Sequence, residues 1–259
     1  MRADPMPAGP GPGGEWDGYV ERFHTGRPGV TEALLARSID DEDRTAYDWV
    51  SEDLPDGLVI DVGCGSGPTQ PMVRRWVGVD RSGPELDVAR RHGRGPLVQA
   101  SASALPLRDR AVCAAMAAMS LMVIDDPSAA VAELARVLRS GGTLRVLLPA
   151  DRPLSVADRV RYGLLLAVLG RRALPFPRPD VAAAPGPLLA AAGFEVLSDE
   201  RRRFRFAVTG RDEVDLFIDS LYLPGVGARR VGLARAVMRS SGQGEIGIPL
   251  RRVTARLTR

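Results

Sequence analysis

Short apolar segments alternate with helical patterns between residues 58 and 148, and this alternation constrains the fold more than any other feature of the chain. We predict strands over five segments, which are 58–62, 76–79, 97–99, 111–118 and 143–148. Strands that alternate with helices form a parallel sheet, because each crossover helix packs back onto the sheet with right-handed chirality. The sequence therefore predicts an α/β protein with a doubly wound, mostly parallel sheet.

Helix signals occupy the gaps between these segments. Ser82 stands three residues before Glu85, with Pro84 at an early helical position, which is typical of a helix N-terminus. A second helix is predicted to begin at Asp126, because apolar residues recur after it in steps of three and four, and to stop at the glycines 141–142.

The pattern is looser beyond Pro149. We predict helices over 156–169, 187–192 and 211–221, and strands over 194–197, 203–208 and 246–257. Pro249 in the last strand points to an edge or a bulge. The domain prediction is a flexible tail over 1–15, which is rich in proline and glycine, a helical cap over 16–50, and a main domain over 51–259 with a helical insertion at about 151–192.

Arginine supplies all 35 of the Lys+Arg residues, against 32 Asp+Glu, for a net charge of +3. This small excess indicates nucleic-acid binding only where the arginines cluster on one face. The densest run covers residues 201–206, where two phenylalanines alternate with arginine, and it predicts a solvated strand face rather than a phosphate-binding patch.

Two cysteines, Cys64 and Cys113, are too few for a disulfide framework or a structural zinc cluster. We therefore expect a reducing, cytoplasmic location and no metal. The best candidate for a membrane span, 162–170, is about half the roughly 20 residues that a bilayer requires, so we also expect no membrane span.

Three glycines at alternate positions, Gly63, Gly65 and Gly67, follow the first predicted strand. In a doubly wound sheet this is the edge where ligands bind, and missing side chains let a ligand reach backbone amides. Asp80 ends the second strand, where a carboxylate can accept from both hydroxyls of a ribose. A plain glycine-rich turn and an aspartate that caps the next turn are the structural alternatives. Pro68 stands where a dinucleotide-binding fingerprint requires its third glycine. The sequence therefore disfavours the hypothesis of a nicotinamide-dependent reductase.

The stretch 58–148 resembles the class I S-adenosylmethionine-dependent methyltransferases, in the small-molecule group of ubiquinone and menaquinone biosynthesis. Four segments match the family motifs in order: 59–67, 77–82 with 86–90, 104–109 and 125–142. The resemblance implies a Rossmann-like sheet of seven strands with helices on both faces and an antiparallel last strand. The link between Gly67 and Asp80 is about one helical turn short for the family, so the first helix should be stubby.

The resemblance also implies a site for S-adenosylmethionine, which leaves S-adenosylhomocysteine as product. Asp80 would hold the ribose, the glycine loop would lie near the methionine part, and Asp61 would orient that loop close to the ammonium group. The predicted cofactor-binding residues are Asp61, Gly63, Gly65, Gly67, Asp80, Arg81, Ser101 and Ala102. Ser101 stands where the family commonly has an aspartate against the adenine, and residues 122–123 replace a frequent histidine pair.

Methyl transfer is an in-line displacement, and a general base is required only for a hydroxyl or a protonated amine. His24 is the candidate base or substrate contact, with a structural or surface role as the alternative; His92 is predicted to lie at the surface. The apolar helix 156–169 carries leucines at 164, 165, 166 and 169 that would line a hydrophobic acceptor pocket or simply fill the core.

We therefore predict an enzyme that methylates a small molecule at O, N or C and that binds no nucleic acid; the leucines of 156–169 motivate the hypothesis of a hydrophobic acceptor. A non-catalytic S-adenosylmethionine-binding protein is the first alternative. An RNA methyltransferase is the second, because the isoelectric point is near 9.3.

Overall fold

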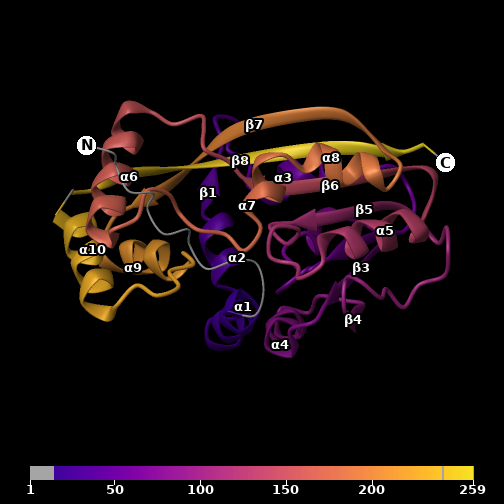
Figure 1. Cartoon of the computed structure of the whole chain (residues 1–259), viewed down its shortest axis with the longest axis horizontal. Helices are drawn as coiled ribbons and strands as arrows, with labels where there is room; N and C mark the ends of the chain where they lie inside the picture. The colour runs from indigo at the N-terminus through magenta and orange to yellow at the C-terminus, as the bar shows by residue number, and fades with distance from the viewer. Residues whose placement is uncertain (1–14, 241, 259) are drawn as a thin grey trace, which may run out of the picture.

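The computed structural model describes residues 15–240 and 242–258 (Figure 1). Its centre is an eight-stranded sheet with the order β1-β7-β8-β6-β5-β2-β3-β4. The strands are β1 Ser38–Ile39, β2 Val59–Val62, β3 Trp76–Asp80, β4 Leu97–Gln99, β5 Val112–Ala118, β6 Leu138–Pro149, β7 Phe194–Val208 and β8 Gly244–Leu257. The predicted flexible tail lies almost wholly outside the described residues.

The strand directions confirm the predicted architecture. Strands β2 to β6 run parallel to one another, and β8 is antiparallel to both of its neighbours, β6 and β7. The predicted number of strands is wrong by one, because Ser38 and Ile39 pair with Phe206 and Arg205 at the far edge. Two residues are too short a strand to show any periodicity in the sequence.

Two predicted strands, 194–197 and 203–208, form the single long strand β7. Two acidic residues between them, Asp199 and Glu200, stay in the ladder because β8 offers arginine partners. Asp199 accepts from Arg251 Nε at 2.7 Å, and Glu200 accepts from Arg252 Nη2 at 2.9 Å. A charged run that breaks the apolar pattern is therefore paired across the sheet.

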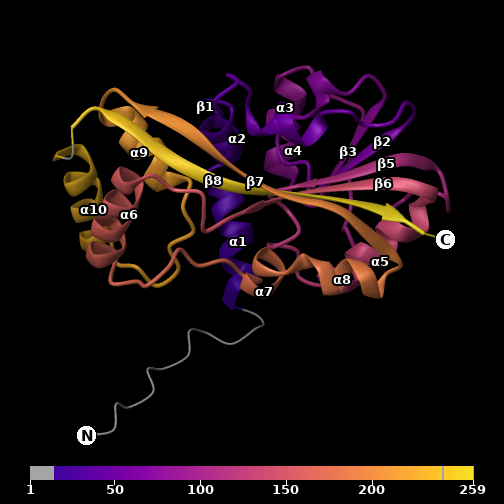
Figure 2. The same ribbon diagram turned by 90° about the horizontal axis from the view of Figure 1, so that it is seen from above.

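Helices cover both faces of the sheet (Figure 2). They are α1 Glu15–Gly26, α2 Val30–Leu35, α3 Ala46–Ser51, α4 Gly83–Arg91, α5 Pro127–Val137, α6 Val156–Leu169, α7 Pro179–Ala183, α8 Pro185–Ala191, α9 Arg211–Asp219 and α10 Ala228–Ser240. One turn of 3₁₀ helix, Gln70–Met72, replaces the first helix after the glycine loop, which confirms that this helix is stubby. Within the described residues, no helix is both long and apolar enough to cross a bilayer.

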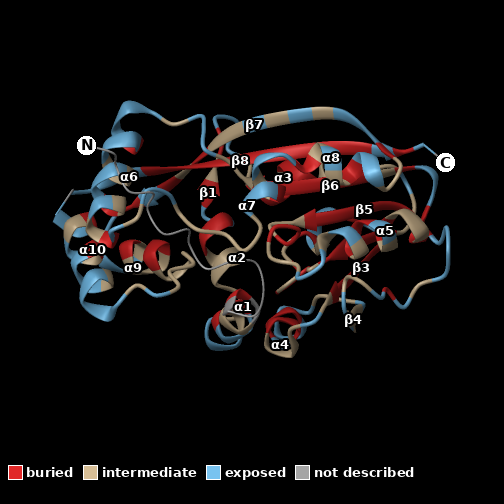
Figure 3. Ribbon diagram, viewed as in Figure 1, coloured by how far each residue is buried: buried red, intermediate tan, exposed pale blue. Residues whose placement is uncertain are grey.

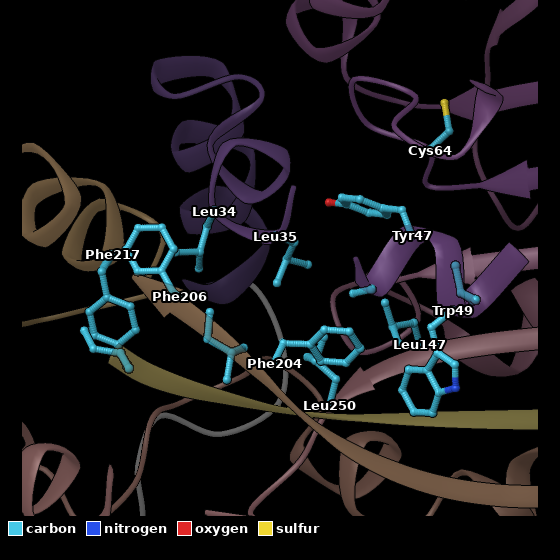
Figure 4. Packing of buried hydrophobic residues seen from close by; sticks show 14 of the residues in the cluster. Leu34, Leu35, Tyr47, Trp49, Cys64, Leu147, Phe204, Phe206, Phe217 and Leu250 are labelled. Carbon is cyan, nitrogen blue, oxygen red and sulfur yellow. The ribbon is translucent and has the colours of Figure 1, made fainter. Parts of the chain in front are cut away.

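Successive residues of the central strands point to opposite faces of the sheet and pack into two apolar layers, one on each face. On β5, Ala114 and Met116 join the layer under α3 and α4, whereas Ala115 and Ala117 join the layer under α5 and α8. Figure 3 shows β5 and β8 almost entirely buried, and β6 is buried over residues 144–148, whereas the more peripheral β7 is partly exposed. Figure 4 shows the first layer, whose side chains gather on one side of β7 and β8.

The ends of β7 and β8 that extend past β6 carry a lobe of α6, α9 and α10 (Figures 1 and 2). The prediction that Pro249 marks an edge strand is wrong for β8 as a whole, which lies between β6 and β7. Pro249 falls just beyond the last β6 pair, Pro149 with Leu250, where its missing N–H costs no ladder bond to β6. No sequence pattern predicted α10, because its arginine-rich helix buries only Ala234 and Met238.

The arginine run on β7 is paired rather than solvated, so that prediction is wrong. Arg202 Nη1 lies 2.8 Å from Asp40 Oδ2, Arg203 Nε lies 2.6 Å from Asp158 Oδ2, and Arg205 donates to the carbonyl of Asp40 at 2.8 Å. All three arginine side chains are less than one third exposed. They stabilise the edge of the sheet and present no free cationic patch.

Candidate functional site

The carboxyl ends of β2, β3, β4 and β5 surround a cavity of about 570 Å³, which we call the glycine-loop cavity. This is the edge at which a doubly wound sheet binds ligands, and the volume lies within the ordinary range for small-molecule sites. The structure brings every predicted site residue except Gly67 to the lining of this cavity. Gly67 instead supports the loop, where an added Cβ would approach Trp76 to 3.3 Å.

The glycine loop adopts left-handed backbone angles that favour glycine. Gly63, Gly65 and Gly67 have φ values of 68°, 54° and 73°. A Cβ on Gly63 would lie 2.4 Å from the Cβ of Ser120, so packing requires glycine there. A Cβ on Gly65 would meet only the carboxyl end of Glu85, with its nearest oxygen at 3.6 Å. The backbone at Gly65 therefore borders open cavity.

Asp80 holds the loop and also faces the cavity. Its Oδ2 accepts from the Gly65 amide at 2.7 Å, and its Oδ1 accepts from the Ser82 amide at 2.8 Å. Burial raises the pKa of Asp80, although these two amide bonds act in the opposite direction. A carboxylate has about four lone-pair sites, so two remain for hydroxyl groups. Asp80 can therefore cap the turn after β3 and still accept from the hydroxyls of a ribose.

Asp61 is a fully buried carboxyl beneath the glycine loop. Thr69 Oγ1 donates to its Oδ2 at 2.5 Å, and Trp76 Nε1 donates to that threonine oxygen at 3.0 Å. The other oxygen, Oδ1, has no partner within the described residues. Burial raises the pKa of Asp61 to about 7. An orphaned acceptor at the lining of the cavity suits a cationic ligand group, such as an ammonium.

Replacing Asp61 with Asn should raise thermal stability at pH 8 but not at pH 5. The carboxyl of the unfolded chain ionises near pH 4, whereas the folded protein keeps the proton up to about pH 7. Between these values the unfolded chain gains the free energy of ionisation while the folded protein stays protonated, so the free energy of unfolding falls as the pH rises, by roughly 3–4 kcal/mol in all. Calorimetric melting at both pH values, with the exposed Asp87→Asn as control, tests this; an equal shift at both would contradict it.

His24, in the last turn of α1, lies inside the site. Its Nδ1 is 2.8 Å from Glu85 Oε1, and its Nε2 is 2.9 Å from the hydroxyl of Tyr222. The second Glu85 oxygen accepts from the Gly29 amide at 2.9 Å. The other histidine, His92, is exposed as predicted.

Sequence reasoning missed Glu85 and Tyr222 as members of this group. Glu85 resembles an ordinary helix-start residue, but its side chain turns to His24 instead of back to Ser82. Tyr222 is 198 residues from His24 in the chain, and no local pattern links the two.

The remaining predicted residues lie on the cavity wall near β3 and β4. Arg81 forms an exposed ion pair with Asp125, and both line the cavity. Ser101 accepts from the Ser103 amide at 3.2 Å, which leaves its hydroxyl proton free to donate. Ala102 adds an apolar contact surface beside it.

A second cavity of about 990 Å³ lies between the carboxyl end of β6, the adjoining part of β8, and helices α2, α6, α7 and α9. Its walls are mainly apolar, with Leu34, Leu35, Leu166, Phe176, Phe217 and Leu250 among them. Of the four leucines proposed for an acceptor pocket, only Leu166 lines this cavity. Leu165 and Leu169 are buried in the core, and Leu164 is 48% exposed.

The two cavities share three lining residues, Thr31, Met119 and Tyr222. Met119 directly follows β5 and has a φ of 59°, a strained value for a residue with a side chain. Such strain is frequent at functional sites, and here it places Met119 at the boundary between the cavities. Among the described residues, no group of acidic, histidine or cysteine side chains has the arrangement of a metal site.

Comparison with known proteins agrees with this geometry. Residues 60–146 match the family model described as a methyltransferase domain. A demethylmenaquinone methyltransferase from Thermus thermophilus is 33% identical over 181 residues, which cover 59% of this chain and 80% of that protein.

Solved structures share the fold. A SAM-dependent methyltransferase from Thermotoga maritima superposes with a TM-score of 0.53 at 18% identity, covering 93% of this chain and 99% of that chain. A Bacillus halodurans protein designated a methyltransferase also has a TM-score of 0.53, at 20% identity, covering 83% and 99% respectively.

Proposed function

We propose that this chain, which belongs to the class I S-adenosylmethionine-dependent methyltransferases, transfers a methyl group to a small apolar molecule held in the second cavity. The observation that carries this proposal is the contact between the two cavities at Thr31, Met119 and Tyr222. A polar site for a nucleoside next to a larger apolar site is the arrangement that a transfer between two bound molecules requires.

The glycine-loop cavity fits S-adenosylmethionine through its unsatisfied groups. Asp80 has lone pairs left for the ribose hydroxyls, the Gly65 backbone is open, and the orphaned Asp61 oxygen suits the ammonium group. Ser101 and Ala102 would lie against the adenine. When bound, the cofactor supplies an electrophilic methyl group on a sulfonium, and S-adenosylhomocysteine remains after transfer.

The residues of the shared wall would orient the acceptor and exclude water. Met119 and Thr31 close the boundary beside the glycine loop, and the leucine and phenylalanine walls bury an apolar body. The Thermus thermophilus relative is named for demethylmenaquinone, and an apolar acceptor of that kind suits these walls. His24 would act as the base for an acceptor that must lose a proton.

Asp80→Ala is expected to weaken S-adenosylmethionine binding about 10- to 150-fold, which corresponds to the roughly 1.5–3 kcal/mol of a hydrogen bond to a charged group. The loss has two sources, because the variant removes the ribose acceptor and also releases the Gly65 amide. Titration calorimetry measures the affinity, and Asp87→Ala, an exposed carboxylate on α4, is the matched control. Unchanged affinity would show that the ribose lies elsewhere.

The function itself is tested by mass spectrometry and acceptor profiling. The purified protein is expected to carry or bind S-adenosylmethionine or S-adenosylhomocysteine, and to transfer a labelled methyl group to a component of the apolar fraction of a cell extract. Cofactor binding with no turnover over a broad panel would instead favour the non-catalytic alternative.

A further inference from the structure

Among the described residues, Tyr222 alone lines both cavities and also forms a hydrogen bond with His24. It follows α9, and its ring lies edge-on against Phe23 with the ring centroids 4.6 Å apart. The next residue in the chain, Leu223, donates its amide to the hydroxyl of Tyr19 at 2.7 Å. Helix α1 therefore holds the Tyr222 ring in a fixed place at the boundary of the cavities.

The hydrogen bonds around His24 have a preferred direction. Glu85 is an acceptor when it is ionised, so it selects the tautomer of His24 with the proton on Nδ1. The bare Nε2 then accepts from the Tyr222 hydroxyl. Burial and the nearby charge of Glu85 raise the pKa of Tyr222, which keeps that hydroxyl protonated and able to donate near neutral pH.

Both ring nitrogens of His24 are occupied by protein partners, so an acceptor reaches the base through the tyrosine. We propose that Tyr222 contacts the methyl acceptor and relays a hydroxyl proton from it to His24. This inference rests on the proposed methyltransferase function and names a further catalytic residue for it.

The relay conserves atoms and charge. The acceptor O–H bond breaks and its proton bonds to the Tyr222 oxygen, while the original Tyr222 proton moves to His24 Nε2. The acceptor oxygen bonds to the methyl carbon, and the electron pair of the broken carbon–sulfur bond stays on sulfur. One positive charge leaves the sulfonium and one appears on the imidazolium, where the Glu85 carboxylate at 2.8 Å stabilises it. Solvent removes that proton after the transfer.

Tyr222→Phe is the central test, because it keeps the ring and its packing and removes only the hydroxyl. With 1,4-naphthohydroquinone, 2-naphthol and the extract acceptor as probes, we expect kcat to fall about 100-fold or more, with KM and cofactor affinity within about threefold. His24→Gln should cause a similar loss, and the double variant should lose little more, because both residues act in one relay.

Tyr19→Phe separates a catalytic role from a structural one. It releases the loop at Leu223 but leaves the Tyr222 hydroxyl in place, so we expect lower stability with kcat retained. Equal loss of kcat in Tyr19→Phe and Tyr222→Phe would overturn the relay and assign Tyr222 a structural role.

A readout independent of turnover comes from the histidines, since the chain has only two. In ¹⁵N-histidine-labelled protein, with His92→Gln as the assignment control, His24 should show the Nδ1–H tautomer, and its Nε2 resonance should move in Tyr222→Phe. An Nε2–H tautomer would overturn the relay. If the wild-type protein does not bind the cofactor, both the proposed function and this inference are overturned. Normal binding with unchanged turnover in Tyr222→Phe, or an N-methylated product, would end only the inference.

Discussion

Gly65→Val is expected to lower the affinity for S-adenosylmethionine at least about 100-fold while the protein remains folded. The Gly65 backbone borders the cavity, and a Cβ there would make only an ordinary van der Waals contact with the carboxyl end of Glu85, at 3.6 Å. The valine methyl groups would therefore occupy space that a ligand needs to approach the backbone. The left-handed φ of 54° adds a cost of about 1–2 kcal/mol to folding, which is less than the stability of most domains.

Gly93→Val provides the matched control for this backbone cost. Gly93 has a φ of 70° and nothing within 4 Å of an added Cβ, and it does not line the glycine-loop cavity. Both variants should lose similar stability in thermal melts, and only Gly65→Val should lose binding in calorimetry. If the folded Gly65→Val protein binds normally, the glycine loop is only a turn.

Asp158→Ala is expected to lower the free energy of unfolding by about 3–5 kcal/mol, the range for breaking a buried ion pair. Asp158 is fully buried where α6 meets β7 and β8. Its oxygens accept from Arg203 Nε at 2.6 Å, from the Gly247 amide at 2.7 Å and from the Ser155 amide at 2.9 Å. Removing the carboxylate leaves the Gly247 amide without this acceptor, and the guanidinium of Arg203 keeps only the more distant Glu245, at 3.9 Å.

The same carboxylate should make wild-type stability fall in acid. Burial alone would raise the pKa of Asp158, but the hydrogen bonds from Arg203, Ser155 and Gly247 outweigh it and hold the pKa well below the ordinary value. The contribution is therefore present above the unfolded pKa near 4 and is lost as the pH falls toward the folded value. This dependence is opposite in sign to that of Asp61, whose ionisation destabilises the fold as the pH rises.

Urea unfolding at pH 7 and pH 3 measures the Asp158 contribution. The difference between wild type and Asp158→Ala should be large at pH 7 and smaller at pH 3. Asp151→Ala, which removes an exposed carboxylate near the start of α6, is expected to cause no measurable change at either pH. A pH-independent difference for Asp158→Ala would show that packing, and not the ion pair, is what was lost.

The glycine-loop cavity could be predicted from the sequence because its determinants are local. Gly63 and Gly65 adjoin a strand end, and Asp80 ends the next strand, so the parallel topology alone brings them to one edge. The orphaned oxygen of Asp61 could not be predicted in this way, since it depends on which donors the folded chain supplies. Thr69 reaches one carboxylate oxygen and leaves the other without a partner.

The group around His24 and the second cavity depend on contacts between distant segments. Sequence reasoning selected His24 from its chemistry, but its partners Glu85 and Tyr222 come from α4 and from the loop after α9. Helix 156–169 was predicted with its observed bounds, yet its periodicity could not tell Leu166, which lines the second cavity, from Leu165 in the core.

The sequence by itself determined the alternation of strands and helices over 58–148, the parallel sheet and the glycine loop, because periodicity, caps and backbone preferences act over a few neighbouring residues. Tertiary structure alone decided the pairing of the β7 arginines, the lobe on the extended β7–β8 ribbon, and the meeting of two cavities at Thr31, Met119 and Tyr222. These features require segments far apart in the chain to meet, and only the packing of the whole sheet brings them together.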